Sequence, residues 1–195
     1  MGYTLLAPRN ERVIIMELKT ARLVLRPWRE SDAESLFEYA SDPRIGPAAG
    51  WQVHKDVQNS LEIIRTVLSA PETYAVCLRG EDRAIGAVGL SVGEQSDLTE
   101  HPEEGEIGYW IGVPFWGMGL IPEAVRELQR HAFEDLNLNV LWCSRFDEND
   151  KSRRVQEKCG FTYRYTKKIY VPALKTEKIL HVSRLTREEW KGERK

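Results

Sequence analysis

The sequence is poor in cysteine, in long apolar runs and in excess charge of either sign. Its three cysteines are widely spaced and form neither a CxxC pair nor a zinc-like set with the four histidines, which predicts reduced thiols, a reducing compartment and no metal site. No apolar run approaches the roughly 20 residues of a membrane span, and Val13–Met16 is too short for a signal peptide. The net charge of −2 lacks the basic excess of nucleic-acid binders. We therefore expect a cytoplasmic protein with no nucleic-acid or membrane partner.

What remains is an ordinary globular composition, with 42% hydrophobic and 30% charged residues in 195. This length favours one domain with its own core. Because Met16 is a candidate alternative start, we expect residues 1–16 to form a loose extension and residues 17–195 to form the domain. The sequence leaves a monomer and a homodimer equally open.

Apolar periodicity predicts a mixed sheet of about six to seven strands flanked by about four helices, an α/β (α+β mixed) class. The expected strands cover residues 22–26, 73–78, 84–92, 106–113, 140–144, 161–171 and 178–185. A first helix is expected to begin at a capping box at residues 31–34 and to end at Asp42-Pro43. Further helices are expected over residues 56–69, about 120–136 and 151–159. Residues 44–54 and 93–105 are expected to be loops, and residues 80–82 the turn of a hairpin.

A glycine-rich turn, Trp116-Gly117-Met118-Gly119-Leu120, joins a predicted strand to a predicted helix. The first amides of a helix have no intrahelical partner, and glycines let a phosphate approach the backbone. The turn is thus a candidate pyrophosphate cradle, and a tight turn without ligand is the alternative. No Gly-Lys-Ser/Thr follows, which excludes a Walker A loop. Pro122 stands where a dinucleotide-binding fingerprint needs its third glycine.

Four stretches together carry a family resemblance. They are Ala21-Arg-Leu-Val-Leu-Arg-Pro27 with Ser31-Asp-Ala33, Glu106-Ile-Gly-Tyr-Trp-Ile-Gly112, Phe115-Trp-Gly-Met-Gly-Leu-Ile-Pro-Glu-Ala124, and Asn149-Asp-Lys-Ser-Arg-Arg-Val-Gln-Glu-Lys-Cys-Gly-Phe161. In this order they resemble a GNAT N-acetyltransferase of the RimJ/RimL (ribosomal-protein N-acetyltransferase-like) type. The resemblance implies the GNAT fold, acetyl-CoA as co-substrate without a metal, and direct acetyl transfer to an amine in a ternary complex.

The resemblance also implies that the central strand splays from its neighbour and that the pantetheine arm of coenzyme A lies in the gap. Backbone groups of Ile111 and Val113 would pair with that arm, and an amide near Ile111 would face the thioester oxygen. The implied coenzyme A-binding residues are Ile111, Gly112, Val113, Trp116, Gly117, Met118, Gly119, Leu120, Ile121 and Asn149. The subgroup often has a basic residue where this chain has Met118, so phosphate binding would depend on backbone amides, helped by Arg126 or Arg130.

Two residues are catalytic candidates. Ser152, three residues after Asn149, is the candidate donor of a proton to the leaving thiolate. The alternative role of Ser152 is helix capping or first-turn polarity, and that of Asn149 is also helix capping. Glu106, at the start of the central strand, is the candidate general base. Its alternative role is that of a strand-end glutamate paired with an arginine.

Two aromatic residues are candidates for contact with the acceptor. Trp51 lies in the loop that should border the acceptor site and is expected to be exposed. Tyr109 lies on the central strand, where a core role is the alternative. Cys143 is not expected to be a nucleophile, because no histidine is near it in sequence and strand cysteines are usually buried.

The predicted reaction is acetyl transfer from acetyl-CoA to a primary amine. A peptide α-amine has a pKa of about 8, and a lysine amine one of about 10.4, so far more of the α-amine is neutral at pH 7. A protein or peptide N-terminus is therefore the first acceptor hypothesis. A small-molecule amine, including an antibiotic or an amino acid, is the second. A non-catalytic acyl-CoA-binding protein and an unrelated α/β nucleotide-binding protein are further alternatives.

Overall fold

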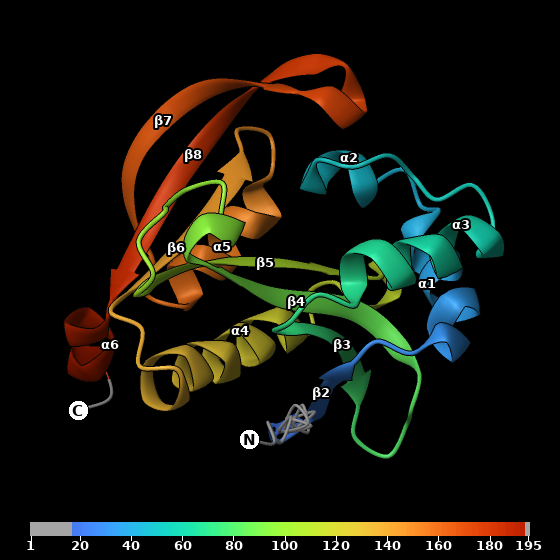
Figure 1. Ribbon diagram of the computed structural model, residues 1–195, viewed down its shortest axis with the longest axis horizontal. Coiled ribbons are helices and arrows are strands. Elements are labelled where there is room, and N and C mark those ends of the chain that lie inside the picture. The colour runs from blue at the N-terminus through green and yellow to red at the C-terminus, as the bar shows by residue number, and fades with distance from the viewer. Residues whose placement is uncertain (1–16, 194–195) are drawn as a thin grey trace, which may run out of the picture.

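The computed structural model describes residues 17–193, and within them an eight-stranded sheet forms the centre of the molecule (Figure 1). Its strands are β1 (Leu18–Lys19), β2 (Leu23–Pro27), β3 (Thr73–Leu78), β4 (Ala84–Val92), β5 (Glu104–Ile111), β6 (Val140–Phe146), β7 (Thr162–Val171) and β8 (Thr176–Thr186). The spatial order is β1-β2-β3-β4-β5-β6-β8-β7. All neighbours pair antiparallel except β5 and β6, which pair parallel.

Helices cover both faces of this sheet. The α-helices are α1 (Ala33–Ala40), α2 (Gly46–Ala49), α3 (Val57–Ile63), α4 (Leu120–Arg130), α5 (Asp150–Lys158) and α6 (Arg187–Glu193). Turns of π-helix, η2 (Ile64–Leu68) and η5 (His131–Asp135), extend α3 and α4, and 3-10 turns are η1 (Glu30–Asp32), η3 (Gly93–Gln95), η4 (Val113–Phe115) and η6 (Pro172–Leu174). None of the helices between residues 17 and 193 has both the length and the apolar character of a membrane span.

The sheet divides the core into two layers, and successive side chains of β3 alternate between them. Tyr74 and Val76 point into the larger layer, where the buried face of α4 packs. Ala75 and Cys77 point to the opposite face and pack with α1 and η2. Successive side chains of a strand face opposite sides, so a strand that is apolar throughout must be covered on both.

Most predicted elements are confirmed, including the α/β class and the antiparallel β3–β4 hairpin. The described residues contain one strand more than the upper estimate, because Leu18–Lys19 pairs with β2. They contain two more helices, α2 and α6. The predicted loop at residues 44–54 holds α2, a single turn between Pro47 at its start and a left-handed Gly50 at its end. The expected extension, residues 1–16, lies outside the described part of the chain.

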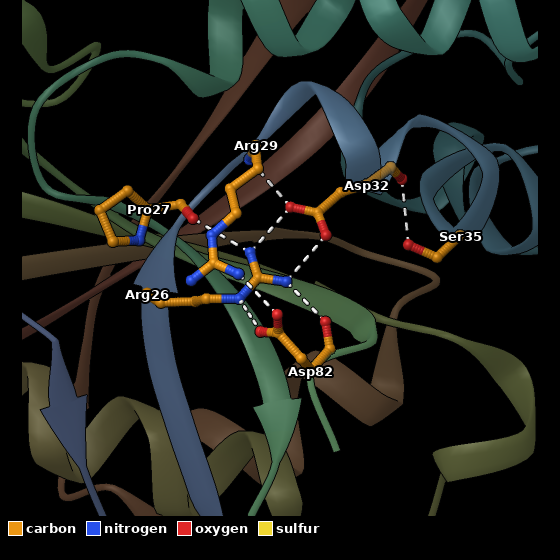
Figure 2. Close-up of polar contacts among 6 residues, drawn as sticks. All are labelled: Arg26, Pro27, Arg29, Asp32, Ser35 and Asp82. Carbon is orange, nitrogen blue, oxygen red and sulfur yellow. Dashed lines mark hydrogen bonds and ion pairs between the residues drawn. The ribbon is translucent and has the colours of Figure 1, made fainter.

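The first helical segment begins differently from the expected capping box. The helical turn η1 begins at Glu30, and the carboxylate of Asp32 accepts a hydrogen bond from the Arg29 amide at 2.8 Å. Asp32 is buried, and its charge is compensated there by the guanidinium of Arg26, which donates two hydrogen bonds of 2.8 Å to it. Figure 2 shows Arg26 between Asp32 and Asp82, whose carboxylate accepts from Arg26 Nε at 2.7 Å. We call Arg26, Asp32 and Asp82 the Arg26 cluster; it ties β2 to α1 and to the β3–β4 hairpin.

Candidate active site

The central strands separate within the sheet. The parallel pairing of β5 with β6 covers only Glu104–Glu106 against Val140–Trp142, although β5 continues to Ile111 and β6 to Phe146. The splay implied by the family resemblance is therefore present. A cavity of about 200 Å³ lies at this separation. Its lining residues come from α2, β5, β6, α5 and β8, and they include Glu106, Tyr109, Cys143, Asn149 and Ser152.

Ser152 is held at the first turn of α5 by Asn149. The Asn149 side chain accepts a bond from the Ser152 amide at 3.0 Å, so the capping role of Asn149 is confirmed. Its amide nitrogen donates to the Ala48 carbonyl at 3.1 Å and thus ties α5 to α2. Ser152 is buried, and its Oγ lies 2.9 Å from the hydroxyl of Tyr109. Two hydroxyl groups therefore share one hydrogen bond at the edge of the cavity.

Glu106 is a largely buried carboxylate without a cationic partner. Its oxygens accept bonds from Ser96 Oγ at 2.9 Å, from the Asp97 amide at 3.1 Å and from Ser144 Oγ at 3.4 Å. Among residues 17–193 it forms no ion pair, so the expected alternative of a glutamate paired with an arginine is wrong. Burial raises the pKa of Glu106 despite the bonds from Ser96 and Asp97, which act in the opposite direction. A carboxylate of this kind is suited to accept a proton.

The sulfur of Cys143 also lies in this cavity but is not activated. Burial raises the pKa of Cys143 to about 12, so the thiolate is scarce at neutral pH. All three cysteines are free and buried. No group of three or more potential metal ligands occurs among the described residues.

The glycine-rich turn has the backbone conformation that a cradle needs. Gly117 and Gly119 have φ angles of 78° and 73°, in the left-handed region where a side chain would be strained. Gly119 caps α4, and a Cβ on Gly117 would meet no atom within 4 Å. Leu120 and Ile121 are buried and anchor the helix start, while Met118 is exposed. The space beside Gly117 is therefore open, next to the start of α4.

The strand end before this turn is partly occupied by the chain itself. The indole of Trp116 donates to the Ile111 carbonyl at 3.0 Å, and the Trp116 amide donates to the Val113 carbonyl at 3.1 Å. The Gly112 amide donates to Ile85 at 2.8 Å. Each of the two carbonyls retains a second lone pair. The Lys151 ammonium lies 4.2 Å from the centre of the Trp116 ring and links the turn to α5.

Trp51 is placed differently from the expectation. It is half-buried and packs against Trp110, with ring centres 6.0 Å apart, and against His54 at 5.3 Å. A Cβ on Gly46 would lie 2.7 Å from the Trp51 ring, so glycine is needed beneath it. The expected exposure of Trp51 is wrong, because α2 folds the loop back onto the sheet. Trp51 is not among the residues that line the cavity.

Sequence reasoning missed several residues near the site. Ala48 and Ala49 of α2, together with Phe146 and Leu180, line the cavity. At the far side, the β7–β8 hairpin curves toward α2 (Figure 1), where Gln52 Nε2 donates to the Ala173 carbonyl at 2.7 Å. The small residues Gly46–Ala49 were the only sequence signal for a close approach here. Arg22, beside the glycine turn, carried no local signal.

Comparison with known proteins agrees with this geometry. The sequence profile of the acetyltransferase (GNAT) domain matches residues 22–162. The Bacillus subtilis protein YdaF, named as a candidate ribosomal N-acetyltransferase, is 35% identical over 179 residues, which cover 88% of this chain and 95% of YdaF. The FsC-acetyl coenzyme A-N(2)-transacetylase of Aspergillus fumigatus is 30% identical over 186 residues, 89% of this chain and 77% of the relative.

Solved structures place the fold in the same group. A GNAT-family acetyltransferase from Bacillus anthracis superposes with a TM-score of 0.76 at 22% identity, over 89% of this chain and 99% of that one. The fold is thus the GNAT fold, and the unrelated nucleotide-binding alternative is excluded. The chain belongs to the GNAT acetyltransferase family and is an acetyl-CoA-dependent N-acetyltransferase.

Proposed function

We propose that this enzyme acetylates the α-amine of a protein or peptide N-terminus, as a member of the RimJ/RimL-type subgroup. The observation that carries the proposal is the cavity between β5 and β6, which brings the Glu106 carboxylate and the Ser152–Tyr109 hydroxyl pair together. At about 200 Å³ it is small. A terminal residue and its amine suit such a volume better than a large aminoglycoside does.

Each of the two groups would carry one proton of the reaction. Glu106 accepts a proton from the attacking amine, directly or through a water molecule, as the nitrogen bonds to the thioester carbonyl carbon. When the carbon–sulfur bond breaks, Ser152 donates its hydroxyl proton to the departing coenzyme A thiolate. The hydroxyl of Tyr109, 2.9 Å from Ser152 Oγ, orients that donor. The proton held by Glu106 then passes through solvent to the Ser152 oxygen, which restores both groups, and the products are the acetylated amine and coenzyme A.

Coenzyme A would bind along the second half of β5 and the glycine turn. The amides at Gly117, Met118, Gly119, Leu120 and Ile121 would receive the pyrophosphate. The pantetheine arm would lie against Ile111, Gly112, Val113 and Asn149, with an amide near Ile111 facing the thioester oxygen. The Trp116 side chain would lie between the pyrophosphate site and the pantetheine site. Tyr109, which lines the cavity, would bound the acceptor side. Two observations support this assignment: the positive φ angles of Gly117 and Gly119, and the segment of β5 that has no pairing with β6.

The proposed acceptor class follows from the pKa values of the two kinds of amine. At pH 7 roughly a tenth of an α-amine is neutral, against a few parts in ten thousand of a lysine amine. A single carboxylate such as Glu106 is a modest base, so it suits the amine that is already partly deprotonated. The similarity to YdaF, named as a candidate ribosomal N-acetyltransferase, points in the same direction.

The test compares short peptides that have a free N-terminus with the same peptides blocked at the N-terminus but carrying a lysine. Acetylation is followed by mass spectrometry with acetyl-CoA present. We expect a mass increase of one acetyl group only on peptides with a free N-terminus. Acetylation confined to lysine or to small amines would overturn the acceptor assignment.

A small-molecule amine is the second candidate acceptor. It is favoured by the 30% identity to the Aspergillus fumigatus FsC-acetyl coenzyme A-N(2)-transacetylase, which covers 89% of this chain. A panel of amino acids, other small primary amines and aminoglycosides, tested beside the peptides at equal concentration, distinguishes the two candidates by kcat/KM.

A further inference from the structure

Arg22, just before β2, contacts the glycine turn from a distant part of the chain. Its Nη1 donates to the Met118 carbonyl at 3.0 Å, and its Nε donates to Glu123 Oε2 at 2.6 Å. The residues are 96 and 101 positions apart from Arg22 in sequence. The guanidinium therefore fixes the outer carbonyl of the turn and, at the same time, the first turn of α4.

Glu123 creates an electrostatic problem for a phosphate site. It lies in the first turn of α4, where its carboxylate and an incoming phosphate would compete for the same amides and the same helix dipole. Three donors from the segment before β2 bind this carboxylate: Thr20 Oγ1 at 2.5 Å, the Arg22 amide at 2.8 Å and the Arg22 guanidinium. These bonds hold Glu123 away from the helix amides and lower its pKa against the effect of burial.

Arg22 retains one donor group that faces the turn. A Cβ built on Gly119 would lie 3.7 Å from Nη2 of Arg22, so this nitrogen lies directly beside the turn. Nη2 has no hydrogen-bond partner among residues 17–193, and the side chain is half-exposed. Of the five donors of a guanidinium, those on Nη2 are thus available to a ligand.

The two arginines expected to assist the phosphates are engaged elsewhere. Arg126 donates to the Lys158 carbonyl at 2.7 Å, and Arg130 binds Glu127 and Asp135 toward the end of α4. Met118 supplies no charge. Of these three arginines, Arg22 is the one with a guanidinium nitrogen beside Gly119 that has no hydrogen-bond partner among residues 17–193.

We propose that Arg22 is a coenzyme A-binding residue that contacts the pyrophosphate through Nη2 while its other nitrogens hold Met118 and Glu123. The inference rests on acetyl-CoA binding at the glycine turn and does not depend on which amine is acetylated. Arg22 supplies in space the positive charge that the turn lacks in sequence.

The test uses two acetyl donors that differ only in the nucleotide part, acetyl-CoA and S-acetyl-pantetheine. In Arg22→Ala we expect the Kd for acetyl-CoA, measured by calorimetry, to rise about 10- to 100-fold, the range for a charged hydrogen bond. The ratio of kcat/KM for acetyl-CoA to that for S-acetyl-pantetheine should fall by a similar factor. An unchanged Kd, or equal losses with both donors, would overturn the proposal.

Further variants separate charge from fold. Arg22→Lys keeps the charge but loses the fork that binds Glu123 and Met118 together, so we expect an intermediate Kd. Arg65→Ala removes an arginine that is similarly exposed and paired with Glu30, and it should leave the Kd unchanged. If Arg22→Ala does not fold, Arg22→Lys decides: a Kd equal to that of the wild type sinks the proposal. If no peptide is acetylated, the acceptor assignment fails while the Kd comparison still tests Arg22.

Discussion

The Arg26 cluster and the Glu106 cavity both bury ionisable side chains, but they surround them with different partners. In the Arg26 cluster the guanidinium has two carboxylates, Asp32 at 2.8 Å and Asp82 at 2.7 Å, and Asp82 also pairs with Arg29, so each charged group has a partner of opposite sign (Figure 2). In the cavity the Glu106 carboxylate has only hydroxyls and one amide, and burial raises its pKa.

The difference shows how partners assign a role to a buried charge. Opposite charges at hydrogen-bond distance fix one protonation state, and the group then serves the fold. A buried carboxylate without a cation has its two protonation states closer in free energy, and it can exchange a proton during a reaction. Perturbing each group should therefore change a different measurable quantity.

The largest effect should follow removal of the Arg26 guanidinium. Arg26→Ala leaves Asp32 as a buried, unpaired charge, so we expect the free energy of unfolding to fall by about 3–5 kcal/mol. Denaturant unfolding followed by circular dichroism measures it. Arg29→Ala removes an exposed partner of Asp82 and should have little effect. Equal losses in the two variants would contradict the distinction between the buried and the exposed bonds.

In the cavity, Ser152→Ala should change the rate and spare the fold. A general acid contributes about 10²–10⁴-fold to rate, and we expect kcat to fall within that range while acetyl-CoA affinity stays within about threefold. The measurements are steady-state kinetics and calorimetry. A fall in kcat of less than about threefold would show that Ser152 is only a polar residue of the first turn of α5 or that water protonates the thiolate.

Glu106→Gln should reduce activity in a pH-dependent way. Because the pKa of Glu106 is raised, the wild-type rate should fall as the pH drops through that raised value, where the base becomes protonated. The variant should be slowest relative to wild type near pH 7 and should recover as the pH approaches the amine's pKa of about 8, where the free amine needs no base. Profiles of kcat/KM against pH provide the check. A defect independent of pH would remove Glu106 as the base.

The smallest effect should be a gain in stability for the same variant. A carboxyl group whose pKa is raised by folding stabilises the protein below its unfolded pKa, and this contribution is lost as the pH rises through the folded pKa. Glu106→Gln should thus be more stable than wild type at pH 7.5, by about 0.5–2 kcal/mol, and similar near pH 4. Urea unfolding at the two pH values tests the sign. A less stable variant at pH 7.5 would mean that the bonds from Ser96 and Asp97 outweigh desolvation.

Features with local causes were predictable from the sequence. Gly117 and Gly119 favour a turn, and Asn149 at the start of a predicted helix offered a cap as one of its two roles. The succession of strands and helices along the chain followed from periodicity, because alternation and turn residues act over a few positions.

Features that depend on distant partners were not predictable from the sequence. Ser152 and Tyr109 are 43 residues apart, and Arg22 and Glu123 are 101 residues apart, so no local pattern links them. Trp51 was expected to be exposed because nothing in the residues beside it indicates that Trp110 covers it. The role of Glu106 depended on whether a cation lay near it in space, which only the folded chain reveals.

The short pairing between β5 and β6 has a consequence for deuterium exchange. Amides of Glu104–Glu106 lie within a paired ladder, while β5 from Ile107 to Ile111 has no strand beside it on the β6 side. Amides directed into that gap should exchange quickly in the free enzyme and slowly once a pantetheine arm lies there as a substitute strand. Exchange at those amides would then report donor occupancy directly, even in a variant that no longer transfers the acetyl group.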